Sequence, residues 1–344
     1  MTFNKQKALI ISVLGASHAV VDFCCAAVLY TLIGKVDIVL LLKLVVIYNV
    51  LAFGLQSVFG FMADKTKKPV NYAIWGCLFL IGGISICKNP MLTIILMGIG
   101  NALFHTGGGI ISLEMGNGRA KLPGAFVAPG AVGLFLGSFW ALIPNVENIW
   151  LAFFPLICIT LMMFLEIPQE KQKIYENNAS IPIYSIILIL IMISVCIRSF
   201  VGLSFDFAAK DNFNLLLTLV FAIATGKFAG GILADKFGMF NTAVIGLLIS
   251  APLLKFGYIP QLAILGMFLF NLTMPVTLTA LANMMPKYKG LAFGLTTLAL
   301  LIGFLPVICG FKVSQSMFTA EIVIISAVVT AVSLKLYEKL FNRP

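Results

Sequence analysis

GFMADKTKKP, residues 60–69, has a counterpart in GILADKFGMF, residues 231–240. Each copy ends a long apolar segment with the triplet Ala-Asp-Lys. The aspartates of the two triplets, Asp64 and Asp235, lie 171 positions apart. A single short match of this kind is weak evidence. It raises the question of whether the whole chain repeats with that offset.

A second pair of segments answers the question. NALFHTGGGIISLEM, residues 101–115, and NLTMPVTLTALANMM, residues 271–285, begin 170 positions apart. Two anchors that agree within one residue indicate an internal duplication. The sequence therefore predicts two similar halves, residues 1–166 and 183–344, joined by a cytoplasmic linker at residues 167–182.

The composition places both halves in a membrane. The chain has 344 residues, of which 60% are hydrophobic and only 10% charged, whereas soluble domains carry about 25% charged residues. A spanning helix needs roughly 20 apolar residues. We therefore expect an all-α integral membrane protein of about twelve transmembrane helices in two six-helix repeats, with no soluble domain. The apolar stretches lie near residues 8–33, 38–62, 69–87, 91–114, 122–143, 149–166, 183–208, 213–234, 240–258, 260–284, 289–310 and 315–337.

The net charge of +10 is explained by the membrane topology, because the basic residues lie mainly on one side of the membrane and do not form a nucleic-acid-binding patch. When the breaks between apolar stretches are assigned alternately to the two sides, one side holds fifteen Lys and Arg residues and the other four. Cytoplasmic loops carry the excess of these residues. We expect a multi-pass protein of the cytoplasmic (inner) membrane, with both termini in the cytoplasm, lipid around it and no nucleic-acid partner.

The repeated loop motif resembles the signature of the major facilitator superfamily. Gly60, Asp64 and Lys65 follow the second span, and Gly231 and Asp235 follow the eighth. The resemblance covers the whole chain. It implies that spans one, four, seven and ten line a central cavity, and that these loop residues hold an inner gate by contacts to neighbouring helix ends.

The fifth span carries a second, looser resemblance. GAFVAPGAVG, residues 124–133, is similar to the glycine-rich and proline-rich signature of antiporters. Pro129 can bend this helix, because proline lacks the backbone N–H that would continue the hydrogen-bond ladder. We therefore count Pro129 with the gate residues, and the pattern favours export.

A finer resemblance points to the fosmidomycin-resistance branch, whose members export drugs. It rests on His18-x-x-x-Asp22 in the first span, GNALFH at 100–105 in the fourth and IRSFVG at 197–202 in the seventh. That branch typically has Phe-His-Pro-Glu in the fourth span. Here the same place reads Phe-His-Thr-Gly from position 104, so the acidic residue is absent.

Ionisable residues stand in the middle of predicted cavity helices, where they are costly and usually functional. Asp22, His105 and Arg198 each lie about fourteen or fifteen residues into their spans, which places all three near mid-bilayer. His18 and Asp22 are four residues apart and share a helix face. Burial disfavours an ionised carboxylate and nearby cations favour it, so we predict that this group binds a coupling proton.

Arg198 offers a planar fork of donors that suits a carboxylate or phosphonate, which favours a small anionic substrate. The alternative is that Arg198 only neutralises Asp22, and that the substrate is an apolar drug. Asn101 and Asn271 occupy matching places in the fourth and tenth spans and are further candidates for substrate contact. Hydrogen bonding between helices is the competing interpretation of both asparagines.

We predict a secondary transporter that works by alternating access, most simply proton-coupled efflux of a small molecule by a monomer. Uptake by proton symport and a non-transporting sensor are the alternatives. An enzyme is not expected, because the sequence has no His-Glu-x-x-His, Gly-x-Ser-x-Gly or nucleotide-binding loop. The seven cysteines include no Cys-x-x-Cys pair, so no metal, disulfide frame or other cofactor is expected.

Overall fold

The computed structural model describes residues 3–86, 88–144, 146–168, 180–311 and 319–341. Every regular element within these ranges is a helix. The elements are α1 (Phe3–Tyr30), α2 (Ile38–Asn49), the π-helix η1 (Val50–Gly54), α3 (Leu55–Thr66), α4 (Pro69–Ser85), α5 (Pro90–Gly116), α6 (Lys121–Trp140), the 3-10 helix η2 (Asn148–Ala152), α7 (Phe153–Met163), α8 (Ile181–Ser204), α9 (Phe213–Phe237), α10 (Met239–Lys255), α11 (Pro260–Asn271), α12 (Thr273–Met284), α13 (Lys289–Ile308) and α14 (Thr319–Phe341).

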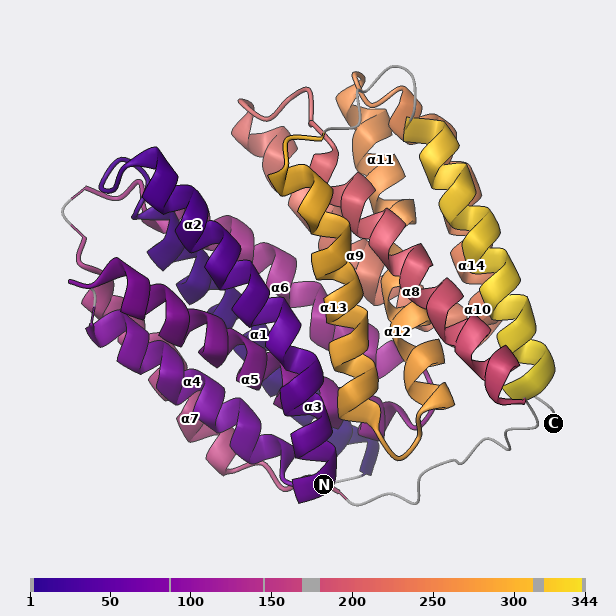
Figure 1. Ribbon diagram of the computed structural model, residues 1–344, viewed down its shortest axis with the longest axis horizontal. Helices are drawn as coiled ribbons and strands as arrows, with labels where there is room; N and C mark the ends of the chain where they lie inside the picture. The colour runs from indigo at the N-terminus through magenta and orange to yellow at the C-terminus, as the bar shows by residue number, and fades with distance from the viewer. Residues whose placement is uncertain (1–2, 87, 145, 169–179, 312–318, 342–344) are drawn as a thin grey trace.

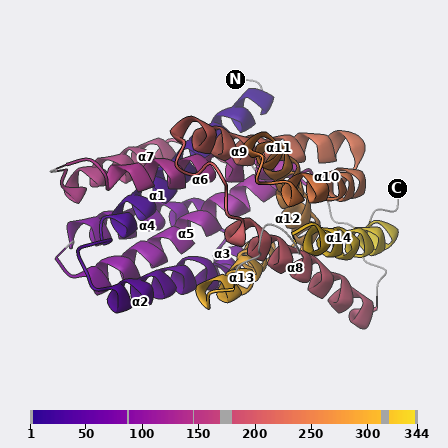
Figure 2. The same ribbon diagram turned by 90° about the horizontal axis from the view of Figure 1, so that it is seen from above.

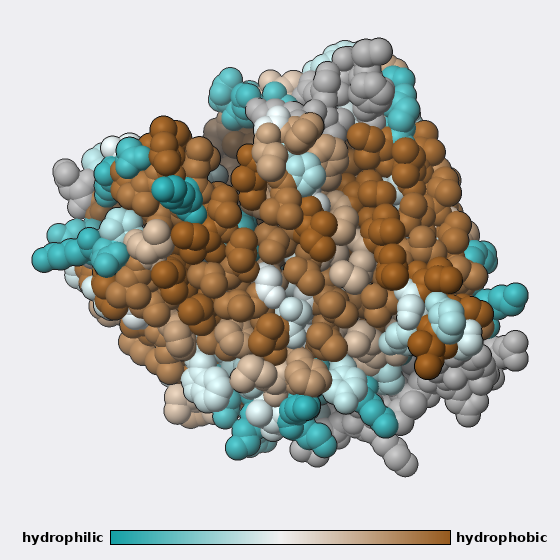
Figure 3. All heavy atoms as spheres, in the orientation of Figure 1, coloured by the Kyte–Doolittle hydropathy of each residue, from teal (hydrophilic) through white to brown (hydrophobic). Residues whose placement is uncertain are grey.

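These helices form the expected apolar spans. In the described chain, nine helical segments are long and apolar enough to cross a membrane, and three shorter apolar segments complete a set of twelve. The second span is α2, η1 and α3 in series, and the tenth is α11 followed by α12. Figure 3 shows hydrophobic residues covering the side of the molecule and hydrophilic ones gathered toward its two ends. The prediction of an all-α membrane fold with about twelve spans is confirmed.

Local sequence explains where several spans begin and end. Asn89 precedes α5, and its side chain accepts a hydrogen bond from the Leu92 N–H; Asn212 does the same for Leu215 at the start of α9. Asparagine is among the preferred residues at this capping position. At the other end of α5, Asn117 takes the left-handed conformation (φ 47°), which stops the helix.

The helices form two lobes (Figures 1 and 2). The first lobe contains α1–α7 and the second contains α8–α14. The lobes lie close together at the end of the molecule where the described chain begins and ends, and they diverge toward the opposite end. We call the first of these the terminal end.

Two helix pairs make most of the contact between the lobes, and glycines allow their close approach. α3 packs on α13, where a Cβ on Gly60 would collide with the backbone of Gly290. α6 packs on α9, where a Cβ on Gly231 would lie 2.5 Å from the Ala120 carbonyl oxygen. Both glycines come from the repeated motif, so the motif lies at the lobe interface in both copies.

Candidate functional site

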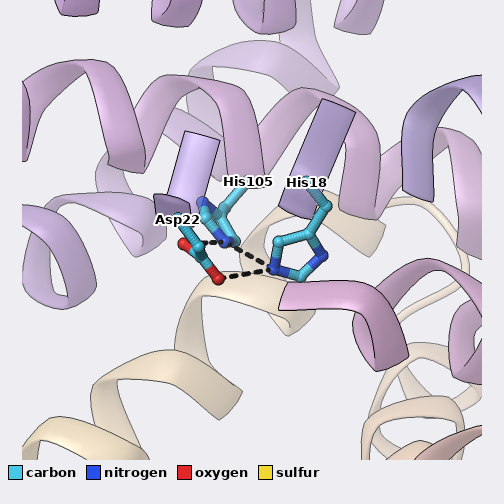
Figure 4. Close-up of side chains that lie close together, drawn as sticks. All are labelled: His18, Asp22 and His105. Carbon is cyan, nitrogen blue, oxygen red and sulfur yellow. Dashed lines mark hydrogen bonds and ion pairs between the residues drawn. The ribbon is translucent and has the colours of Figure 1, made fainter. Parts of the chain in front are cut away.

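His18, Asp22 and His105 form one cluster of polar side chains (Figure 4). The Nε2 atom of His18 lies 3.2 Å from Asp22 Oδ2, and the Nε2 atom of His105 lies 3.5 Å from Asp22 Oδ1. The two Nε2 atoms are 2.9 Å apart. The side chains are at most 12% exposed, so the group is enclosed by protein.

Two helices of the first lobe build this cluster. His18 and Asp22 come from α1 at a spacing of four residues, which puts them on one face of the helix. His105 comes from α5, together with Asn101 one turn earlier. The side-chain amide of Asn101 donates a hydrogen bond to Asp22 Oδ1 at 3.2 Å. The structure therefore brings together four of the polar residues that the sequence singled out.

The second nitrogen of each imidazole ring is engaged by the backbone. His18 Nδ1 is 2.7 Å from the Phe126 carbonyl oxygen, and His105 Nδ1 is 2.9 Å from that of Asn101. A carbonyl oxygen only accepts hydrogen bonds, so each Nδ1 carries a hydrogen and each neutral ring leaves its Nε2 as an acceptor. Two acceptor nitrogens and a carboxylate thus face one another, an arrangement that requires a cation among them.

Gly130 of α6 passes directly over the cluster. A Cβ at this position would meet His18 Nε2, and would lie 2.5 Å from Asp22 Oδ2. Glycine at 130 thus keeps one side of the cluster free of any side chain. Its neighbour Pro129 lies inside α6, near Gly15 of α1.

Lys227 is a cation near the cluster that the sequence analysis did not select. It lies in α9 of the second lobe and interacts electrostatically with Asp22 and His105. No hydrogen bond or ion pair of Lys227 is found among the described residues. Its backbone carbonyl lies against Gly124 of α6, six residues before Gly130, about 9 Å along that helix. An extended lysine side chain covers most of that distance.

Arg198 occupies a separate place in the second lobe. Its guanidinium donates hydrogen bonds to Thr273 Oγ1 and, at 3.0 Å, to Thr277 Oγ1. Both threonines belong to α12 and are fully buried, while Arg198 itself is 7% exposed. Its Nε has no hydrogen-bond partner. In the described part of the chain no carboxylate pairs with Arg198, so the suggested Asp22–Arg198 pair is not formed here.

The remaining candidate, Asn271, does not join either group. Its side-chain amide donates to the Met267 carbonyl oxygen within its own helix, at 2.8 Å. Thr273 and Thr277 contact Arg198 in its place. Depth in the membrane could have selected these threonines, but it could not show which residue of α12 faces α8.

The carboxylates of the repeated motif lie at the terminal end. Asp64 of α3 accepts hydrogen bonds from the N–H groups of Gly290 and Leu291, at 2.8 and 2.9 Å. Asp235 of α9 accepts them from Ala120 and Lys121, at 2.7 and 3.2 Å. Each acid thus caps the first turn of a helix in the other lobe, where the helix dipole favours negative charge.

Lys65 packs on Phe61, whose ring stacks on Tyr288 of the second lobe. Its Nζ lies 4.5 Å from the centre of the Phe61 ring. A cavity of about 620 Å³ lies beside Asp235 and Lys121 at the terminal end. None of the residues that line it belongs to the histidine cluster.

Among the described residues, one group has side chains placed to hold a metal ion, and it is His18, Asp22 and His105. From the sequence alone, these residues are predicted to bind a proton and no metal site is expected. Their arrangement as ligands becomes visible once α1 and α5 are packed together.

Comparison with known proteins gives a consistent result for the fold. No protein-family model matches the chain. A curated relative, the uncharacterized MFS-type transporter YfnC of Bacillus subtilis (strain 168), is 24% identical over 294 residues, which cover 72% of this chain and 71% of YfnC.

Two solved structures match almost the full length. The human organic anion transporter MFSD10 (TETRAN) has a TM-score of 0.70 at 12% identity, covering 96% of this chain and 99% of that one. The E. coli fucose:proton symporter FucP has a TM-score of 0.63 at 12% identity, covering 97% and 98%. The chain therefore has the fold of major facilitator transporters. Nothing in these comparisons singles out the fosmidomycin-resistance branch.

Proposed function

We propose that the protein is a secondary active transporter that carries a small anionic solute across the cytoplasmic membrane by alternating access. The observation that carries this proposal is Arg198, a buried cation held by two threonine hydroxyls without a carboxylate partner among the described residues. The fold and the relatives support the transporter class. They leave the solute, its direction and the coupling ion open.

The surroundings of Arg198 favour an anion as its missing partner. A charge buried without compensation is costly, and neutral hydroxyl groups offset only part of that cost. A carboxylate or phosphonate would complete the site through a bidentate contact with the guanidinium. MFSD10 is described as an organic anion transporter, and we extend that substrate class, in its broad sense, to this chain.

Proton coupling is the second part of the proposal. The acceptor atoms of His18, Asp22 and His105 face one another at 2.9 to 3.5 Å, so a proton shared between two of them would be stabilised electrostatically by the third. Proton-driven efflux is the form that we favour, because the antiporter-like pattern around Pro129 points to export. Symport of the solute with protons uses the same residues in the opposite direction.

The lobe arrangement supports an assignment of state and orientation. We assign the closed terminal end to the cytoplasm, since the basic loops lie on that side by the sequence analysis. The protein would then be outward-facing in this structure, with Asp64 and Asp235 holding the cytoplasmic gate shut. Opening of that gate would expose the Arg198 site to the cytoplasm.

A flux assay in liposomes tests the proposal. Purified protein is reconstituted with a pH-sensitive dye inside, a pH gradient is imposed, and small phosphonates and carboxylates are added in turn, followed by apolar drugs. We expect proton movement that depends on an anion and is absent in Asp22→Asn. Its sign separates antiport from symport.

Matched variants identify the part of the proposal that fails. Arg198→Gln should remove anion dependence. The exposed-loop variant Lys67→Gln, which alters a charge outside both sites, should behave as the native chain. Flux of apolar drugs that persists in Arg198→Gln would overturn the anionic substrate. No flux of any solute, with correctly folded protein, would favour the non-transporting sensor.

A further inference from the structure

We infer that His18, Asp22 and His105 form a binding site for a divalent first-row transition-metal ion of the Zn²⁺ type, held within the first lobe near the middle of the membrane. This inference goes beyond the proposed function, because metal binding is an equilibrium property that can be measured without transport. It rests on the mutual distances of the ligand atoms, on the groups that orient them and on the glycine that packs against them.

The distances between the ligand atoms are close to those around a tetrahedral ion, and the two Nε2 atoms would have to move apart by about 0.4 Å to share one. Zinc bonds to imidazole nitrogen and carboxylate oxygen are about 2.0–2.2 Å long, which places neighbouring ligand atoms of a tetrahedron roughly 3.3–3.5 Å apart. The observed separations are 2.9 Å between the two Nε2 atoms, and 3.2 and 3.5 Å from these nitrogens to the Asp22 oxygens. One ion can therefore contact all three side chains with little movement.

The surrounding groups orient the ligands as in known metal sites. Metal-binding histidines usually donate their second ring N–H to a carbonyl or carboxylate, which fixes the tautomer and directs the other nitrogen at the metal. His18 does so through Phe126 and His105 through Asn101. The coordinating carboxylate is itself held by the side-chain amide of Asn101.

A metal ion suits the cluster better than a single proton in one respect. A proton can be shared between two acceptor atoms, whereas three acceptors converge here. The ligand set of two imidazoles and one carboxylate suits Zn²⁺, Co²⁺ and similar ions, while Mg²⁺ and Ca²⁺ prefer an all-oxygen shell. Three protein ligands also leave one position open, as in catalytic zinc sites.

Two nearby features set limits on the site. Gly130 packs against His18 and Asp22, so a Cβ there would collide with the ligand atoms and displace them. Lys227 interacts electrostatically with Asp22 and would oppose a divalent ion. The metal affinity is therefore expected to be moderate, and to rise when the charge of Lys227 is removed.

Because α1 and α5 both belong to the first lobe, a bound metal would not tie the two lobes together. It would compete with a coupling proton for the same atoms. Saturating metal is therefore expected to suppress proton-coupled flux without locking the gate.

Equilibrium binding to the full-length protein tests the inference. Protein without a polyhistidine tag is purified in detergent, treated with EDTA and dialysed against Zn²⁺, and bound metal is measured by mass spectrometry. We expect one ion per chain. Asp22→Asn and His105→Gln should each weaken binding at least ten-fold, and Gly130→Ala should do the same with all three ligands still present. Lys227→Met should strengthen it.

Cobalt spectroscopy and a cysteine variant exclude other sites. Co²⁺ in a tetrahedral nitrogen and oxygen site gives visible d–d bands, and a thiolate ligand would add a charge-transfer band in the near ultraviolet. Cys25→Ala, which removes the nearby thiol that contacts Asn101, should retain binding. Size-exclusion and thermal unfolding profiles show which variants are folded.

Binding that is absent at millimolar Zn²⁺, unchanged in folded His105→Gln, or lost in Cys25→Ala would overturn the inference. Any of these results would leave the flux experiment untouched. Conversely, metal binding without solute flux would support the metal site and contradict the proposed transport function.

Discussion

Asp64 and Asp235 lie 171 positions apart, and each accepts two backbone N–H groups from the start of a helix in the opposite lobe. The repeated motif is therefore used twice across one interface, in reciprocal fashion. A carboxylate at such a position stabilises a helix start by about 0.5–2 kcal/mol. The two acids should accordingly shift the balance between closed and open terminal ends without affecting the membrane fold.

Replacement of Asp64 by Asn should favour the open terminal end, because the amide keeps one acceptor and loses the charge. The lost charge–dipole interaction is worth about 0.3–1 kcal/mol and one lost hydrogen bond about 0.5–1.5 kcal/mol, so the open-to-closed ratio should rise by roughly four-fold to seventy-fold. Distances between spin labels on the two lobes at the terminal end, measured in detergent and lipid, check this. Lys43→Gln is the control, since Lys43 is exposed on α2, which packs on α5 and η1 of the first lobe. An unchanged distance distribution in Asp64→Asn would contradict the assignment.

Gly60→Leu should act on the same equilibrium by a steric route. A side chain at position 60 meets the Gly290 backbone, so the α3–α13 contact cannot close. The variant should fold and populate the open terminal end, and it should transport at less than about a tenth of the native rate, because one half of the cycle is blocked. Leucine at position 62, in place of the lipid-exposed Met62, is a matched substitution that should leave both properties unchanged.

Arg198→Lys should raise the substrate KM by roughly ten-fold or more, because lysine keeps the charge and loses the bidentate fork. The maximal rate should change less than KM. Thr277→Val should have a smaller effect of the same kind, since Thr273 still holds the guanidinium. Concentration-dependent flux or substrate-induced thermal stabilisation measures the shift. Equal KM values for native and Arg198→Lys protein would place the solute elsewhere.

Asn101→Leu should impair coupling without removing any ionisable group. The Asn101 amide donates to Asp22 and stabilises the ionised carboxylate. The lost hydrogen bond to a charged group is worth about 1.5–3 kcal/mol, so the proton affinity of Asp22 should rise about ten-fold or more and the pH dependence of flux should move to higher pH. The dependence of flux on external pH, compared with that of the native protein, is the measurement. Asn271→Leu removes a hydrogen bond within one helix and should leave this dependence unchanged.

The helices were largely predictable, because charged or turn-forming residues bound each apolar run. The α5 span was expected near 91–114 and runs from Pro90 to Gly116, with caps that the sequence shows at both ends. The π-helix η1 within the second span was not predictable, since its residues, VLAFG, look like any apolar helix.

The candidate site was predictable by depth but not by direction. Counting residues into each span placed His18, Asp22 and His105 at one level, and they meet. The same count put Arg198 level with Asp22, yet Arg198 faces α12, because depth along a helix says nothing about which neighbour a side chain meets. Lys227 was not selected from the sequence, because its interaction with Asp22 depends on how α6 packs against both α1 and α9.

The reciprocal caps also bear on the order in which the protein can assemble during synthesis. All residues of the metal-ligand cluster occur before position 106, so that group is complete once the first lobe has entered the membrane. The partner of Asp64 is separated from it by 226 residues and emerges from the ribosome much later. The first lobe can therefore bind an ion during synthesis, before the second lobe is present to form the gate with it.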